Sequence, residues 1–349
     1  MHRAFPLWWN VGWDGGVMGV PDSVTQVRAQ QITSLDGPDA LHIADVAEPD
    51  ASGRVLIDVA AAGASFPDLL MSRGLYQTKP PLPFIPGVEV AGTVRSAPPE
   101  SGLQPGDRVM AMTLHGGFAE RVAADVALTS RIPQQLTTEQ AAGFIMNYHT
   151  AHFALVRRGR LRAGESIVVH GAGGGLGSAC VQVARAIGAR VLAVVSSDEK
   201  AGVAREAGAD DTVVTGAGSW SDQIRALTDG RGAAVVVDPV GGDRFDESLR
   251  ALAPEGRLII VGFAEGRIPT VQANRVLFRN IDIVGAAWGA FLAVEPSLFG
   301  DTRDALQALV ASDAIRPVVG VTFPLERAAD ALRALEQRRA LGKIVVTLP

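Results

Sequence analysis

The strongest chemical signal in the sequence is a glycine-rich run between a strand pattern and a helix pattern. It reads Gly171-Ala172-Gly173-Gly174-Gly175-Leu176-Gly177 and follows the apolar segment 167–170. Glycines allow a tight turn and let backbone N–H groups approach a pyrophosphate, and the N-terminus of the next helix adds a partial positive charge. The run therefore predicts a dinucleotide site, with contacts from Gly171, Ala172, Gly174, Gly175, Leu176 and Gly177.

The residues after the second predicted strand indicate which dinucleotide is bound. An NAD enzyme usually has an acidic side chain here, which binds the ribose hydroxyls and repels a 2′-phosphate. This chain instead has neutral hydroxyls at Ser196 and Ser197 and a cation at Lys200. The pattern favours NADPH as the cofactor, while Asp198 in the same segment keeps NADH as the alternative.

The segments around the glycine run predict an α/β fold. Continuous apolar stretches at 167–169 and 235–237 are typical of parallel strands that helices cover on both faces. The predicted strands are 166–170, 190–195, 212–214, 233–238, 257–261 and 281–284. The predicted helices are 176–187, 199–207, 219–227 and 243–252. This alternation predicts the doubly wound parallel sheet of a Rossmann domain.

The flanking segments have a different pattern. Residues 27–124 contain short strand patterns separated by glycine and proline. These strands are predicted at 55–59, 88–94, 107–112 and 118–122, with one short helix at 65–72. A long helix is predicted at 137–156, with Thr137 as its N-cap. The chain is predicted to end with helices at 296–312 and 325–337 and a strand at 343–348.

Composition excludes several classes of protein. The 349 residues include 32 basic and 37 acidic side chains, so the net charge is −5 and we expect no nucleic-acid partner. The single cysteine, Cys180, excludes an intrachain disulfide and a cysteine-rich zinc site. No apolar run is long enough to span a membrane. We expect residues 1–26 to be an extension outside the folded domains, and the protein to be cytoplasmic.

Six motifs in order make the sequence similar to the zinc-independent quinone oxidoreductases of the medium-chain dehydrogenase/reductase superfamily. The motifs lie at 61–76, 86–92, 105–109, 171–177, 238–242 and 342–345. The resemblance implies a mainly-β, chaperonin-10-like (GroES-like) catalytic domain formed by 27–148 and 289–349. It also implies a Rossmann NADP-binding domain at 149–288, and a substrate cleft between the two domains.

The resemblance also indicates a site without metal. Zinc-containing relatives have a cysteine near the position of Ser65 and a histidine at the position of Val88, and valine cannot ligate zinc. Their four-cysteine lobe has no counterpart in the short segment 96–107. His149 and His152 are three residues apart, but no third ligand accompanies them. We therefore expect no metal site.

The resemblance assigns further residues to the site. Tyr76 falls at a position that lines the substrate cleft, and we expect it to be the first hydrogen-bond donor to the substrate, with Ser65 second. Thr150 matches a threonine near the nicotinamide, and Arg339, like Lys200, falls where it can reach the 2′-phosphate. The expected cofactor contacts are completed by Val240, Gly262 and Phe263.

The sequence thus predicts an NADPH-dependent oxidoreductase that delivers a hydride to a quinone or an activated alkene. The alternatives are an enoyl-thioester or enone reductase on the same scaffold, and a non-catalytic dinucleotide-binding protein. The apolar segment 280–287 reads as the last strand of the Rossmann sheet. Because an exposed apolar edge invites pairing, we also expect a symmetric homodimer joined at this strand.

Overall fold

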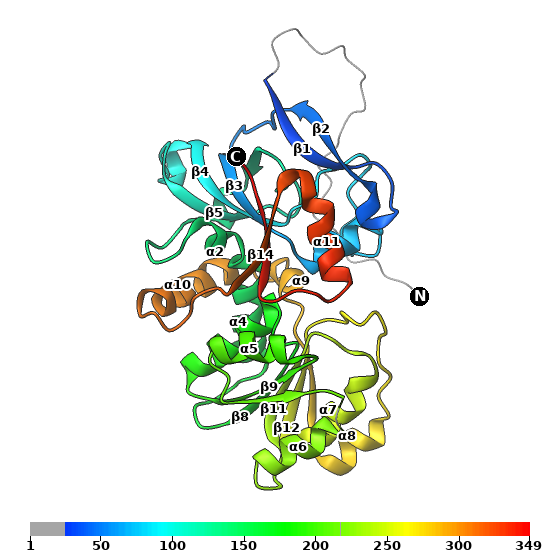
Figure 1. The fold of residues 1–349 in the computed structure, drawn as a ribbon. Coiled ribbons are helices and arrows are strands. Elements are labelled where there is room, and N and C mark those ends of the chain that lie inside the picture. The colour runs from blue at the N-terminus through cyan, green and yellow to red at the C-terminus, as the bar shows by residue number, and fades with distance from the viewer. Residues whose placement is uncertain (1–24, 217) are drawn as a thin grey trace.

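The computed structural model describes residues 25–216 and 218–349 (Figure 1). Residues 1–24 of the predicted extension lie outside the described residues, and the first strand, β1, begins at Gln26. The strands form a six-stranded sheet, a seven-stranded sheet and a two-stranded ribbon. Figure 1 shows the two large sheets at opposite ends of the molecule, with helices α9 and α10 between them.

The six-stranded sheet is entirely parallel and has the strand order β10-β9-β8-β11-β12-β13. Its strands are β8 (Ser166–His170), β9 (Arg190–Val195), β10 (Asp211–Val214), β11 (Ala233–Asp238), β12 (Leu252–Ile260) and β13 (Asp282–Gly285). Its helices are α4 (Gly175–Ile187), α5 (Asp198–Glu206), α6 (Trp220–Leu227), α7 (Phe245–Ala251) and α8 (Ala273–Arg279). The predicted doubly wound parallel sheet is confirmed.

The apolar strands of this sheet are explained by burial on both faces. In β8, Ile167 and Val169 belong to a core cluster that includes Val181 of α4, whereas Val168 belongs to a second cluster with Trp220 of α6. Successive side chains of a strand point to opposite faces. Both faces of the sheet are therefore dry, and every position along the strand favours an apolar residue.

The seven-stranded sheet is built from both ends of the chain. Its order is β14-β15-β3-β4-β5-β7, and β6 also pairs with β3. The strands are β3 (Val55–Gly63), β4 (Glu89–Ser96), β5 (Arg108–Met112), β6 (Arg121–Ala124), β7 (Thr129–Arg131), β14 (Val319–Pro324) and β15 (Lys343–Thr347). Strand β15 runs antiparallel to β3. Together with the ribbon of β1 (Gln26–Ile32) and β2 (Leu41–Ala47), these strands make the expected mainly-β domain.

Helices connect and cover the two sheets. They are α1 (Phe66–Ser72), α2 (Thr138–Ala142), α3 (Thr150–His152), α9 (Trp288–Leu292), α10 (Leu298–Ala311) and α11 (Ala328–Glu336). Thr137 caps α2 as predicted, because its Oγ1 accepts the Gln140 N–H at 3.2 Å. The single helix predicted at 137–156 is instead a succession of α-helix and π-helix, with π segments at Ile145–His149 and Phe153–Arg158. Within the described residues, none of the helices is long and apolar enough to cross a membrane.

A buried histidine lies where this helical stretch meets α9 and α10. The ring of His149 packs against Trp288 (centroids 5.2 Å apart) and Phe299 (4.7 Å). Among the described residues neither ring nitrogen has a hydrogen-bond partner. Burial lowers the pKa of His149 to about 3, and the positive charges of His152 and Arg303 act in the same direction.

We expect His149→Phe to flatten the pH dependence of unfolding. Between about pH 3 and pH 6.5 the unfolded chain binds a proton at His149 that the native ring excludes, so the stability present above pH 6.5 is lost on acidification. At pH 5 the loss is about 2 kcal/mol. Phenylalanine keeps the ring packing and removes this loss. Urea unfolding at pH 7 and pH 5 measures it, and the exposed His42→Gln is the control. Equal pH dependence in His149→Phe and the parent chain would contradict the prediction.

Candidate active site in the interdomain cleft

The glycine loop connects β8 to α4 at the carboxyl edge of the parallel sheet. Two of its glycines are required by close packing. A Cβ at Gly177 would lie 2.0 Å from the Gly171 carbonyl oxygen, and a Cβ at Gly173 would lie 2.6 Å from Cβ of Lys200. The loop is thus pressed against both α4 and α5. The 13-residue α4 begins at this loop, and its N-terminus carries the partial positive charge that favours a pyrophosphate.

Three further expected cofactor residues lie at the same edge of the sheet. Val240 is next to the loop, since a Cβ at Gly171 would lie 3.5 Å from Val240 Cγ2. The Val240 N–H donates to Asp238 Oδ1 at 2.8 Å, which fixes the turn after β11. Gly262 and Phe263 follow β12, the neighbouring strand. The structure therefore brings these residues together with the glycine loop.

A group of cations surrounds the end of β9. Lys200 Nζ donates to Ser196 Oγ at 3.0 Å and to the Arg338 carbonyl oxygen at 2.7 Å. Burial lowers the pKa of Lys200, and the charges of Arg244 and Arg338 lower it further. Three like charges held near one another favour binding of an anion. Ser197 serves as the N-cap of α5, its Oγ accepting the Lys200 N–H at 3.4 Å.

The sequence did not single out Arg244 and Arg338. Arg338 lies in the turn after α11 with a φ of 56°, and its guanidinium donates to the Glu265 carbonyl oxygen at 3.2 Å. Its neighbour Arg339, which the family resemblance predicts as a phosphate contact, is exposed, and its N–H donates to the Ala334 carbonyl oxygen. A phosphate contact by Arg339 stays a prediction.

The C-terminal segment joins the two domains at the glycine loop. The Gly342 N–H donates to the Gly173 carbonyl oxygen at 2.8 Å, and Gly342 pairs with Gly174 as an isolated parallel bridge. Residues 338–343 therefore pass directly from the cation group to the loop.

Ser65 lies on the catalytic-domain side in a buried polar network. It is the N-cap of α1, and its N–H donates to Asp68 Oδ2 at 2.9 Å. Its hydroxyl accepts from Lys343 Nζ at 2.7 Å and donates to Glu89 Oε1 at 3.1 Å. Burial raises the pKa of Asp68 to about 7, against the opposing hydrogen bonds from the Gly87 and Ser65 N–H groups. Ser65 was predicted from the sequence, whereas Lys343 was not.

Tyr76 and Thr150 complete the expected set. Tyr76 is half-buried and packs against the small cluster of Ile32, Met71, Phe84 and Val88. Burial raises the pKa of Tyr76, and the negative charge of Asp68 raises it further, so the phenol is a neutral donor at pH 7. Thr150 opens α3 and is partly exposed. Met146, four residues before Thr150, packs on the same cluster as Tyr76.

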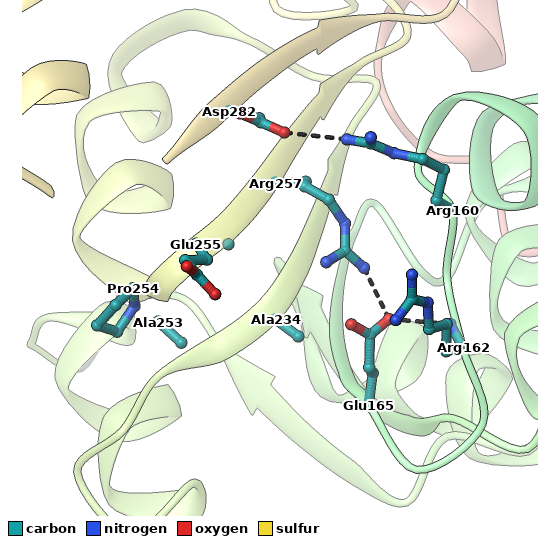
Figure 2. Close-up of a pocket in the computed structure, with 10 residues that line it drawn as sticks. Arg160, Arg162, Glu165, Ala234, Ala253, Pro254, Glu255, Arg257 and Asp282 are labelled. Carbon is teal, nitrogen blue, oxygen red and sulfur yellow. Dashed lines mark hydrogen bonds and ion pairs between the residues drawn. The ribbon is translucent and has the colours of Figure 1, made fainter. Parts of the chain in front are cut away.

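A separate cavity of about 370 Å³ lies at the opposite, amino-terminal edge of the parallel sheet (Figure 2). Its charges pair with one another: Arg257 with Glu165 at 2.7 Å, and Arg160 with Asp282 at 3.0 Å. Nucleotides bind at the carboxyl edge of such sheets. We therefore assign the candidate site to the carboxyl edge of the sheet, beside the glycine loop, and not to this cavity. In the part of the chain that the structure describes, no three His, Cys, Asp or Glu side chains group as metal ligands.

The chain is similar to known proteins over most of its length. Residues 51–135 match the family model described as alcohol dehydrogenase GroES-like domain, and residues 175–311 match the one described as zinc-binding dehydrogenase. Quinone oxidoreductase-like protein 2 of Mus musculus is 37% identical over 324 residues, which cover 92% of each chain.

Two solved structures are similar along nearly their whole length. A probable oxidoreductase from Mycobacterium abscessus has a TM-score of 0.86 and 41% identity, covering 93% of this chain and all of its own. The quinone oxidoreductase from Thermus thermophilus, whose structure was also determined in complex with NADPH, has a TM-score of 0.80 and 38% identity. It covers 92% of this chain and 100% of its own.

Proposed function

Because the chain belongs to the quinone oxidoreductase family of the medium-chain dehydrogenase/reductase superfamily, we propose that it transfers a hydride from NADPH to a quinone or an activated alkene without a metal ion. The observation that carries the cofactor assignment is the cation group of Lys200, Arg244 and Arg338 beside the glycine loop. The Thermus thermophilus relative, which binds NADPH, supports the same choice.

The chain's own residues have three tasks in this reaction. Bound NADPH supplies the hydride, and the protein supplies position and charge control. The glycine loop and the α4 N-terminus hold the pyrophosphate, and the cation group holds the 2′-phosphate. On the other wall, Tyr76 and Ser65 present hydroxyl groups to the acceptor oxygen, where negative charge develops as the hydride arrives.

The test is turnover itself. Loss of NADPH absorbance is followed with a panel of quinones, enones and enoyl-CoA thioesters. Faster turnover with quinones supports the proposal, and faster turnover with enoyl thioesters assigns the chain to the alternative reductase. Absence of turnover with every acceptor, while NADPH still binds, would indicate a non-catalytic dinucleotide-binding protein.

Metal independence has a direct measurement. Val88 and the single cysteine Cys180 deprive the chain of the ligands that zinc-containing relatives use. Dialysis against a chelator is expected to leave the rate of NADPH oxidation unchanged. A stoichiometric metal in elemental analysis, with activity lost on its removal and restored on its return, would overturn this part of the proposal.

We expect Tyr76→Phe to lower the rate while leaving cofactor affinity unchanged. Phenylalanine keeps the packing on the Met71 and Phe84 cluster and removes only the donor. Because water can replace it in a partly exposed cleft, the loss in kcat is about tenfold. The acceptor dependence of kcat and the Kd for NADPH measure the two effects. Normal turnover by Tyr76→Phe would remove the phenol from the reaction.

We also propose that two copies of the chain pair through β13. This strand is the edge of the parallel sheet. The preceding helix α8 has no buried residue, and its Leu277 and Phe278 are 69% and 79% exposed. A two-fold axis beside β13 would extend the sheet and cover these side chains.

Phe278→Asp is expected to convert the dimer to monomers, since a charge in an apolar interface is not compensated. Light scattering after size-exclusion chromatography measures the mass. The matched control is Val321→Asp, which places the same charge on β14, the edge strand of the other sheet. A monomeric parent chain, or dissociation by Val321→Asp instead, would contradict the proposed interface.

A further inference from the structure

The side chain of Lys343 is buried and lies against three glycines, Gly63, Gly143 and Gly175, which we call the glycine sleeve. It opens β15 and is 4% exposed. A Cβ at Gly63 would lie 2.8 Å from Lys343 Cε, one at Gly143 would lie 2.6 Å from its Cγ, and one at Gly175 would lie 3.3 Å from its Cδ. These glycines come from β3, from the end of α2 and from the first turn of α4. Three distant segments thus lack side chains where the lysine stem lies.

Beyond the glycine sleeve, the Lys343 ammonium donates hydrogen bonds to two side-chain oxygen atoms. Lys343 Nζ donates to Glu89 Oε1 at 2.6 Å and to Ser65 Oγ at 2.7 Å. Glu89 is 1% exposed, and its other oxygen accepts the Met146 N–H at 2.9 Å. The ammonium and the carboxylate therefore hold each other, and both are tied to the backbone that precedes Thr150.

Stability alone is a poor reason for such a pair. Burying two charges costs desolvation energy, and well-packed apolar residues of similar volume are often as stable or more stable. A Met and a Gln would fill the same space without the charges. The position of the pair offers a better reason. Gly342, the preceding residue, bonds to the glycine loop, and Gly175 begins the helix on which the pyrophosphate rests.

Ser65 is the neutral hydroxyl that bonds to the ammonium, and the proposed function assigns it to the acceptor oxygen. Its oxygen accepts a hydrogen bond from a cation, which makes its own hydrogen a stronger donor, because hydrogen bonds in a chain polarise one another. In the structure that hydrogen points to Glu89 Oε1 over 3.1 Å, a longer contact than either made by the ammonium. A rotation about the Cα–Cβ bond of Ser65 would break this hydrogen bond and turn the hydroxyl hydrogen away from Glu89.

We propose that Lys343 is a positioning residue that supplies the reaction's proton through Ser65; this rests on the proposed function. As the hydride and its electron pair add to the acceptor, the acceptor oxygen becomes anionic. That oxygen takes the Ser65 hydroxyl proton, and Ser65 Oγ takes a proton from Lys343 Nζ. Glu89 keeps its negative charge throughout. The neutral amine regains a proton from water after product leaves, so the balance is NADPH, one proton and the acceptor going to NADP⁺ and the reduced acceptor.

The test uses the double variant Lys343→Met/Glu89→Gln, since Lys343→Met alone would leave the Glu89 charge buried and unpaired. Methionine keeps the stem in the sleeve, and glutamine can still accept the Met146 N–H. We expect near-parental melting and NADPH affinity, an unchanged KM for the acceptor, and a kcat lowered by at least about tenfold. A purely structural pair would give a parental kcat in this variant, and that result would overturn the proposal.

Two further variants make the assignment specific. Ser65→Ala is expected to lower kcat by a similar factor, and adding Lys343→Met/Glu89→Gln to it is expected to cost nothing more, because both act on one proton path. Full additivity would overturn the route through Ser65. The matched control is Arg257→Met/Glu165→Gln, which removes a half-buried pair at the far edge of the sheet (Figure 2) and is expected to leave kcat unchanged.

The outcome also separates this proposal from the proposed function. If the parent chain and the double variant turn over the acceptor equally well, only the role of Lys343 is overturned. If the parent chain fails to oxidise NADPH with every acceptor in the panel, both the proposed function and the role of Lys343 are overturned. If the double variant melts far below the parent, the pair is structural, and the proposal is likewise overturned.

Discussion

Lys200→Glu is expected to weaken binding of NADPH by about a hundredfold while leaving NADH nearly unaffected. Lys200 Nζ donates a hydrogen bond to Ser196 Oγ, and the positive charges of Arg244 and Arg338 are nearby. A charge-assisted hydrogen bond to phosphate contributes about 1.5–3 kcal/mol, and the new carboxylate adds repulsion of the same phosphate. Because NADH carries a hydroxyl in that place, it loses neither interaction. The ratio of the two Kd values, measured by fluorescence titration, reports the effect.

The control is Arg231→Glu, the same charge reversal at a side chain that is 78% exposed and lies in the turn after α6. It is expected to change neither Kd. An equal loss of NADPH and NADH affinity in Lys200→Glu would mean that the lysine supports the fold of the loop and does not contact the 2′-phosphate. If the ratio of the Kd values for NADPH and NADH in Lys200→Glu equals that of the parent chain, the 2′-phosphate contact would be assigned to Arg244 or Arg338.

The sequence was sufficient for the parallel sheet because its signals are local. Strands at 166–170, 190–195 and 233–238 have the predicted limits, since each contains an apolar run whose side chains are buried on both faces of the sheet. Helix α8 was missed for the converse reason: none of its residues is buried, so no apolar stripe marks it. Strand β14 was missed as well. Its side chains are half-buried or exposed, and it is held by pairing with β15.

The site was predicted only where its residues lie near the glycine loop in sequence or match a family motif. Ser196 and Lys200 follow β9 directly and were found. The Arg338 carbonyl reaches Lys200 across 138 residues, and Lys343 reaches Ser65 across 278. Such contacts depend on how β15 docks against β3 and the loop, which no local pattern encodes. The same holds for Arg338, whose guanidinium donates to the Glu265 carbonyl oxygen across 73 residues, while a phosphate contact by Arg339 stays a prediction.

Gly177→Ala is expected to be the most damaging single-methyl change in the nucleotide domain. The added Cβ would lie 2.0 Å from the Gly171 carbonyl oxygen and 2.7 Å from the Ala172 Cα. These are backbone atoms, so no side chain can rotate away, and α4 must move from the loop. Overpacking of this kind costs about 3 kcal/mol, and the displaced helix N-terminus no longer faces the pyrophosphate. We expect a lower melting temperature and a Kd for NADPH raised at least tenfold.

Gly202→Ala in α5 is the matched control for this change. It adds the same methyl group to the neighbouring helix, but a Cβ at Gly202 meets nothing within 4 Å. Alanine is the better helix former, so the free energy of unfolding should rise by about 0.5–1 kcal/mol. The same added methyl group is thus expected to lower the free energy of unfolding at Gly177 and to raise it at Gly202. If Gly177→Ala bound NADPH like the parent chain, close contact between loop and helix would not be what shapes the pyrophosphate site.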